Sequence, residues 1–414
     1  MIGELLDRFE ISPAVAKASR SAAERAAGIE RPSAARVKAS VLRAFFDEGL
    51  SESDLRESYG YGYDDAARDR YESLLGRIFG AERVLARLSL VSGTHAIVAA
   101  LDACLPSGGR LVAVTGRPYD TLRTAIADAP FSLVERGIRY DELPFAGDGR
   151  IDDAAIGRAC AGADVAFVQR SRGYASRRAL SASDCGAIAR AVKAAAPKAT
   201  VVVDNCYCEL VEEREPTHYG VDLAAGSLLK NLGGGLAPGG AYVAGRADAV
   251  ARVAAHHYAP GLDAHVGPTF GFGRALVQGL FGAPHAVAES LAGLDFFAAL
   301  FEGLGYAADP APGASRCDIV QAISLGSAEK VIAFARGLQH AMPVNARFRP
   351  EAGPVPGYRD PVVMSSGAFI SGSTLELSCD APLRPPFEVY VQGGMTREHA
   401  MLGALLAAEA VGAA

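Results

Sequence analysis

The sequence predicts an α/β protein in which a mostly parallel β-sheet is flanked by helices and followed by a smaller α+β domain. Half of the 414 residues are hydrophobic and 21% are charged, a balance typical of globular proteins. Between about residues 66 and 290, short apolar runs alternate with helix-forming segments, which favours a parallel sheet covered on both faces. A chain of this length exceeds one small hydrophobic core, so we expect two domains.

Residues 1–65 are predicted to form an N-terminal helical arm that ends in an interface loop. Up to about residue 50, apolar residues recur at helical spacing among many Ala, Arg and Glu residues. The loop-like segment ESYGYGYDD follows, in which Tyr59, Tyr61 and Tyr63 alternate with glycines.

Residues 66–290 are predicted to form the large domain. Its clearest strands are the β-branched and apolar runs LVAVTG at 111–116, VAFVQ at 165–169 and TVVVDN at 200–205. The segment LSLVSGTHAIVAAL at 88–101 indicates a turn that leads into a helix.

Residues 291–414 are predicted to form the smaller domain. The Gly/Pro/Phe-rich passage from Gly267 to Pro284 is interpreted as the junction, with a helix near 286–304 after it. Strands are expected in DIVQAIS, PVVMSSG and TLELS, and a final helix in REHAMLGALLAAEA.

Composition excludes several classes of function. The formal net charge of −6 and the absence of a dense Lys/Arg run argue against nucleic-acid binding. The N-terminus does not have the order of a secretory signal, and no apolar stretch reaches the roughly 18 residues of a membrane span, so we expect a cytoplasmic protein. Seven scattered cysteines indicate a reducing compartment, and their spacing predicts no metal site.

Lys230 is the most informative of only six lysines. The other five lie in polar-flanked amphipathic stretches, whereas Lys230 lies in the otherwise uncharged window LAAGSLLKNLGGGLAPGGAYVAG. A desolvated lysine with a lowered pKa suits imine chemistry with a carbonyl cofactor. A lysine at the mouth of a loop is an equally good interpretation of this window alone.

Other polar residues of the same block could complete a cofactor site. Asp204 ends an apolar strand, where ligands of open α/β sheets gather, and could pair with a pyridinium nitrogen; such a residue is also often a turn former. Ser92, Gly93 and Thr94 begin a helix and could bind phosphate, or could form an ordinary N-cap. Tyr119, after the strand LVAVTG, could cover a planar ring.

These elements, in this order, resemble the large domain of fold-type-I pyridoxal-phosphate (PLP) enzymes. More closely, the chain resembles the methionine γ-lyase/aluminium-resistance family, a branch of the cystathionine-metabolism enzymes. The resemblance runs from about residue 55 to the C-terminus, and it is carried by the motifs SGTHAI, TGRPYDTL, QRSRGY, VVVDNCY, AGSLLKNLGGGLAPGGAYVAG, APG, QGLFGAPH, PGYRDPVVM and SGSTLELSCDAPLRPPF.

The resemblance implies roles for the cofactor residues. Lys230 would hold PLP as a Schiff base and then move protons, and Asp204 would bond the pyridine nitrogen. Tyr119 would stack on the ring and help to deprotonate the substrate amine. Phosphate would be held by Ser92, Gly93, Thr94 and Ser227, and by Tyr61 from a neighbouring subunit. A homodimer or homotetramer with a shared active site follows, in which Tyr59 or Tyr63 could replace Tyr61.

The substrate implied by the resemblance is an α-amino acid, whose carboxylate is best bound by a bidentate arginine. Arg384 in APLRPPF is our first choice, and Arg172 and Arg177 in QRSRGYASRR are the alternatives.

The implied reaction is β- or γ-elimination, with a thiolate or another group such as halide as the leaving group. Another fold-type-I reaction, such as transamination or racemisation, is the alternative within enzymes, because a fold does not fix the chemistry. A non-catalytic PLP-binding protein is a further alternative.

Overall fold

The computed structural model describes residues 1–145, 149–355 and 357–414. Its larger sheet has the strand order β1-β7-β6-β5-β4-β2-β3. The pairs among β2 to β6 are parallel, and β7 is antiparallel to both β6 and β1. The predicted, mostly parallel sheet is therefore confirmed. The seven strands are β1 (Arg83–Arg87), β2 (Arg110–Ala113), β3 (Arg139–Glu142), β4 (Val165–Gln169), β5 (Thr200–Asp204), β6 (Leu223–Ser227) and β7 (Ala241–Gly245).

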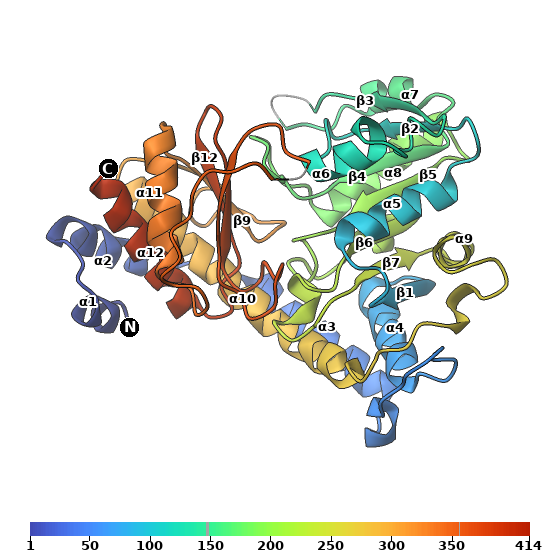
Figure 1. Cartoon of the computed structure of the whole chain (residues 1–414), viewed down its shortest axis with the longest axis horizontal. Coiled ribbons are helices and arrows are strands. Elements are labelled where there is room, and N and C mark those ends of the chain that lie inside the picture. The colour runs from blue at the N-terminus through green and yellow to red at the C-terminus, as the bar shows by residue number, and fades with distance from the viewer. Residues whose placement is uncertain (146–148, 356) are drawn as a thin grey trace.

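Helices cover both faces of this sheet (Figure 1). Because side chains alternate along a strand, β5 sends Val202 to a core with α5 and α9, and Val201 and Val203 to a core with α7 and α8. All five residues of β4 and of β5 are buried, which explains their continuous apolar sequences. The helices of this region are α4 (Ala66–Phe79), α5 (Gly93–Cys104), α6 (Asp120–Arg123), α7 (Asp153–Cys160), α8 (Ala182–Ala195) and α9 (Ala247–His257).

A second, antiparallel sheet has the order β10-β11-β12-β9-β8. Together with α11 and α12 it forms the expected α+β pattern of the C-terminal region. Its elements are β8 (Ala307–Asp309), β9 (Val320–Ser324), α11 (Ala328–Gln339), β10 (Val362–Ser366), β11 (Ser378–Pro382), β12 (Glu388–Gln392) and α12 (Arg397–Gly412).

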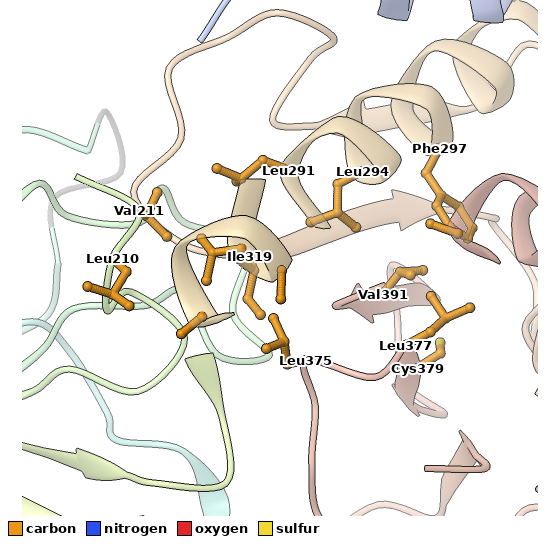
Figure 2. Close-up of a cluster of buried hydrophobic side chains, with 14 of the residues drawn as sticks. Leu210, Val211, Leu291, Leu294, Phe297, Ile319, Leu375, Leu377, Cys379 and Val391 are labelled. Atoms are coloured by element: carbon orange, nitrogen blue, oxygen red, sulfur yellow. The ribbon is translucent and has the colours of Figure 1, made fainter. Parts of the chain in front are cut away.

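Helix α10 (Gly273–Gly303) runs between the two sheets and packs against the N-terminal helices (Figure 1). Figure 2 shows its Leu291, Leu294 and Phe297 beside side chains of the second sheet region, in one continuous hydrophobic core. The N-terminal helices are α1 (Ile2–Arg8), α2 (Pro13–Ala27) and α3 (Pro32–Glu48), as expected for the arm. The domain boundaries at about 65 and 290 stay predictions, and α10 passes through position 290 as one helix.

Two expected elements differ from the structure. TLELS is not a strand: β11 begins only at Ser378, because Leu377 has the left-handed φ of 62° and cannot continue an extended run. The junction passage is largely helical, since α10 begins at Gly273 and contains Pro284 in its interior. No helix in the described ranges is long and apolar enough to cross a membrane.

Candidate active site

A cavity of about 280 Å³ opens at the carboxyl ends of the central strands, beside the N-terminus of α5. Gln169, Asp204 and Ser227 are the last residues of β4, β5 and β6, so parallel strands bring them to one edge of the sheet. The structure gathers seven predicted residues in the lining of this cavity: Ser92, Gly93, Thr94, Tyr119, Asp204, Ser227 and Lys230.

The N-terminus of α5 forms one wall. The Ser92 hydroxyl caps the helix by accepting a hydrogen bond from the His95 amide at 3.1 Å. Gly93 packs so closely that a Cβ there would lie 2.8 Å from the Cys206 Sγ. The Thr94 hydroxyl lies 2.8 Å from the Tyr119 hydroxyl. Backbone amides at such a helix end carry a partial positive charge, which suits an anion.

Asp204 is 5% exposed and lies at the base of the cavity. Its Oδ1 accepts a hydrogen bond from the Cys206 amide at 3.0 Å. Burial raises the pKa of the carboxyl, while the Cys206 amide and the charge of Lys230 act in the opposite direction. A cationic ring nitrogen would supply the missing counter-charge here.

Lys230 follows β6, and its Nζ lies 3.4 Å from the centroid of the Tyr207 ring. The expectation of a lowered pKa is wrong. Burial lowers the pKa of the amine, but Tyr207, Cys206 and Asp204 together raise it above its ordinary value. The neighbours of Lys230 therefore favour its protonated form.

Hydrogen bonds hold both the backbone amide and the side-chain hydroxyl of Tyr119. Its amide donates to the Gln169 Oε1 at 2.9 Å, and its hydroxyl meets Thr94. Burial, with the nearby Asp204 carboxyl, raises the pKa of Tyr119 well above its ordinary value, so the side chain is a neutral phenol.

Sequence reasoning missed several residues of the lining. Tyr174, Tyr207, Tyr358 and Gln392 all line the cavity. The buried Asp380 carboxylate accepts hydrogen bonds from the Tyr174 hydroxyl at 2.6 Å and from the Gln392 Nε2 at 3.1 Å. Tyr207 in VVVDNCY, Tyr174 in QRSRGY and Tyr358 in PGYRDPVVM lie in motifs of the resemblance, whereas Gln392 had no local signal; the fold brings these distant segments together.

No arginine of the described residues lines this cavity. The Arg172 guanidinium pairs with Asp309 at 2.8 Å. That of Arg177 donates to the Gln169 and Ser171 carbonyl groups, and burial lowers its pKa to about 10.

Arg384 pairs with Asp360 at 3.2 Å and lies 3.8 Å from Asp120. It also donates to the backbone carbonyl of Tyr174, whose side chain does line the cavity. Tyr61 lies outside the lining, and its side chain is 75% exposed. The substrate arginine and the role of Tyr61 stay predictions.

The residues present fit PLP. Hydroxyl groups and backbone amides at the start of α5 suit a phosphate, Tyr119 is an aromatic beside them, and Lys230 is a primary amine in the same cavity. Asp204 is a buried carboxyl that forms no ion pair with any residue that the structure describes. The described residues hold no cluster of His, Cys, Asp and Glu that could bind a metal ion.

Comparisons with known proteins agree with this geometry. The family described as methionine gamma-lyase matches residues 12–412. The uncharacterized protein YnbB of Bacillus subtilis (strain 168) is 41% identical over 364 residues, covering 87% of this chain and 86% of YnbB. A crystal structure described as a carbon-sulfur lyase involved in aluminum resistance, from Clostridium novyi NT, has a TM-score of 0.90 at 36% identity and covers 98% of both chains.

A more distant likeness extends to the cystathionine gamma synthase of Xanthomonas oryzae pv. oryzae, solved in complex with cystathionine. It has a TM-score of 0.63 at 16% identity and covers 91% of this chain and 98% of the synthase. At this identity the likeness shows the fold alone, which is that of fold-type-I PLP enzymes.

Proposed function

The chain belongs to the methionine gamma-lyase family, and from this premise we propose that it is a PLP-dependent lyase that catalyses β- or γ-elimination on an amino acid, with cleavage of a carbon–sulfur bond. The observation that carries the proposal is the meeting of Lys230, Asp204 and the N-terminus of α5 in one cavity. An amine, a carboxyl and an anion-binding helix end are what PLP needs from a protein.

Four groups of the cavity would hold the cofactor. Ser92, Gly93, Thr94 and Ser227 would bind its phosphate, Tyr119 would cover its ring, Asp204 would keep its ring nitrogen protonated, and Lys230 would attach to its aldehyde carbon. When bound, PLP supplies an electron-withdrawing ring that accepts the charge left at Cα.

The proton transfers of the proposed reaction would be carried out by side chains of the protein. The Lys230 amine, once free, would take the proton from Cα and hold it within the cavity. For a leaving group on Cγ, a second proton must leave Cβ, whereas a leaving group on Cβ needs no second deprotonation. Tyr174, Tyr207 and Tyr358 line the cavity, and their aromatic rings would limit the access of bulk water to the reacting atoms.

Substrate binding and assembly complete the proposal. Arg384 remains our first choice for the substrate carboxylate, because the Tyr174 carbonyl that accepts from it belongs to a residue of the cavity wall. We propose a homodimer or homotetramer in which Tyr61, exposed in one subunit, reaches the phosphate of the next.

A panel of amino acids tests the reaction type. Purified protein with PLP is incubated with amino acids that carry sulfur, oxygen or halogen at Cβ or Cγ, and the release of keto acid, ammonia and leaving group is measured. We expect release of thiol from a sulfur substrate with equimolar keto acid and ammonia. Keto acid that appears only with an amino acceptor would identify an aminotransferase, loss of optical activity alone a racemase, and no turnover a binding protein. Halide release alone would contradict carbon–sulfur specificity.

A further inference from the structure

The Lys230 amine lies on the face of an aromatic ring. Its Nζ is 3.4 Å from the centroid of Tyr207, well inside the roughly 6 Å within which a cation and a ring face attract each other. Both residues line the active-site cavity. The predicted cofactor set leaves Tyr207 without a role.

The backbone of Tyr207 is held in an unfavourable conformation. Its φ is 71°, a left-handed value that bulky residues rarely adopt. The Tyr207 carbonyl accepts hydrogen bonds from the Asn231 Nδ2 and from the Ile319 amide, both at 3.1 Å. Asn231 directly follows Lys230 and also donates to the Glu209 carbonyl at 2.8 Å. The surrounding structure therefore fixes ring and amine relative to each other, as is common where strain serves a site.

The charged and titratable groups around this pair favour a cation on Lys230. Asp204 and Cys206 face the amine, and together with the phenol group of Tyr207, which acts through its charge and a hydrogen bond, they raise the pKa of the amine although burial opposes them. Asp380 acts on both members of the pair, and Tyr174 lies beyond Tyr207, where its hydroxyl donates to the Asp380 carboxylate.

We propose that the aromatic face of Tyr207 is the resting position of the Lys230 amine in its protonated form, which makes Tyr207 a catalytic residue. The catalytic role of Tyr207 rests on the proposed function. In that reaction, a lysine that has taken the Cα proton must keep this proton close to the substrate until the proton is delivered. A ring face stabilises the ammonium without accepting its proton, and it holds the tethered group in place.

Two substitutions separate the ring from the hydroxyl. Tyr207→Phe keeps a ring face, and Tyr207→Leu removes it. Leucine tolerates this backbone conformation in the same segment, because Leu210 has a φ of 62°. Tyr207→Met is a second variant without a ring, for use if the leucine variant does not fold.

The first test uses the full-length protein after removal of PLP. Lys230 is methylated with formaldehyde and cyanoborohydride at pH 9, and its labelling rate is measured by mass spectrometry. We expect labelling about 30-fold faster in Tyr207→Leu and within about threefold of the wild type in Tyr207→Phe, since an attraction of about 2 kcal/mol corresponds to about 1.5 pKa units and each unit of lowered pKa gives tenfold more free amine. Lys17 is the exposed reference, and Lys193, paired with Asp222 at 2.7 Å, reports any general unfolding.

The second test is turnover of the PLP-loaded variants. Loss of an attraction of about 2 kcal/mol predicts a kcat of Tyr207→Leu roughly 30-fold below the wild type, with Tyr207→Phe retaining most activity. Equal labelling of Lys230 in wild type and Tyr207→Leu, or a phenylalanine variant as altered as the leucine variant, overturns the inference even if elimination occurs. A wild type without elimination activity instead refutes the proposed function and leaves the labelling result standing.

Discussion

Gly93 is the residue on which the phosphate end of the cavity depends most directly. It begins α5, and the space where a Cβ would lie is filled by the Cys206 Sγ at 2.8 Å and the Ser227 Cβ at 3.4 Å. These contacts leave the backbone amides of the helix start facing the cavity, with no side chain between them and an anion.

Gly93→Ala should therefore weaken PLP binding about tenfold or more, because overpacking a filled site costs about 1–3 kcal/mol. The dissociation constant of PLP, followed by absorbance, measures the effect. Cys206→Ala serves as the matched control, and the double variant Gly93→Ala/Cys206→Ala should regain much of the affinity. If Gly93→Ala alone binds PLP as tightly as the wild type, the packing at the start of α5 does not control phosphate binding.

Among single residues, those site residues that stand out within their own sequence window could be predicted from the sequence. Lys230 stood out as the lone charge of its window, and Asp204 as the end of an apolar strand. Tyr174 and Tyr358 lie in motifs of the family resemblance, but only the fold shows that they line the cavity, where Tyr174 donates a hydrogen bond to Asp380. The raised pKa of Lys230 also lay beyond the sequence, since it arises from neighbours that only the fold brings close.

At the scale of elements, the burial of a strand decides whether it can be predicted from the sequence. Strands β4 and β5 are buried on both faces and could be predicted from their apolar runs. Strand β3, with the sequence RYDE, lies at the sheet edge with alternating exposure, so it carries no apolar pattern. The apolar residues of TLELS are buried, but the left-handed backbone of Leu377 delays the strand to Ser378.

Helix α10 shows why glycine and proline hid the start of the helix, which begins at Gly273 rather than near residue 286. Proline removes one backbone hydrogen bond from a helix interior and normally ends or kinks the helix. Pro284 is nevertheless buried inside 31 continuous helical residues, whose packing against α2, α12 and the second sheet outweighs that local cost. Tertiary contacts of this kind are invisible in a local sequence window.

At the scale of the whole molecule, Asp295 joins three distant segments. Located on α10 and 1% exposed, it receives the Arg31 guanidinium at 2.6–2.7 Å from the N-terminal arm and the Arg316 Nε at 3.2 Å from the segment before β9. Burial lowers the pKa of Arg316, and the Asp295 carboxylate opposes that effect. One carboxylate thus pairs with two cations, the buried Arg316 and the partly buried Arg31.

Asp295→Ala should lower the free energy of unfolding by about 3–5 kcal/mol, because it leaves buried charges without a partner. Equilibrium urea unfolding measures the loss. The matched control is Arg25→Ala, which breaks the largely exposed pair between Arg25 and Glu302 at 3.1 Å and should cost less than about 1 kcal/mol. Similar losses in the two variants would show that Asp295 is not the link between these segments.

The central claim is that PLP attaches covalently to Lys230. Its most direct test is reduction of the PLP-loaded protein with borohydride, followed by proteolysis and mass spectrometry of the peptides. The account predicts one reduced pyridoxyl phosphate per chain, located on the peptide that contains Lys230, and none in Lys230→Ala. A label on another lysine, or a protein that binds PLP fully yet yields no labelled peptide, would contradict it.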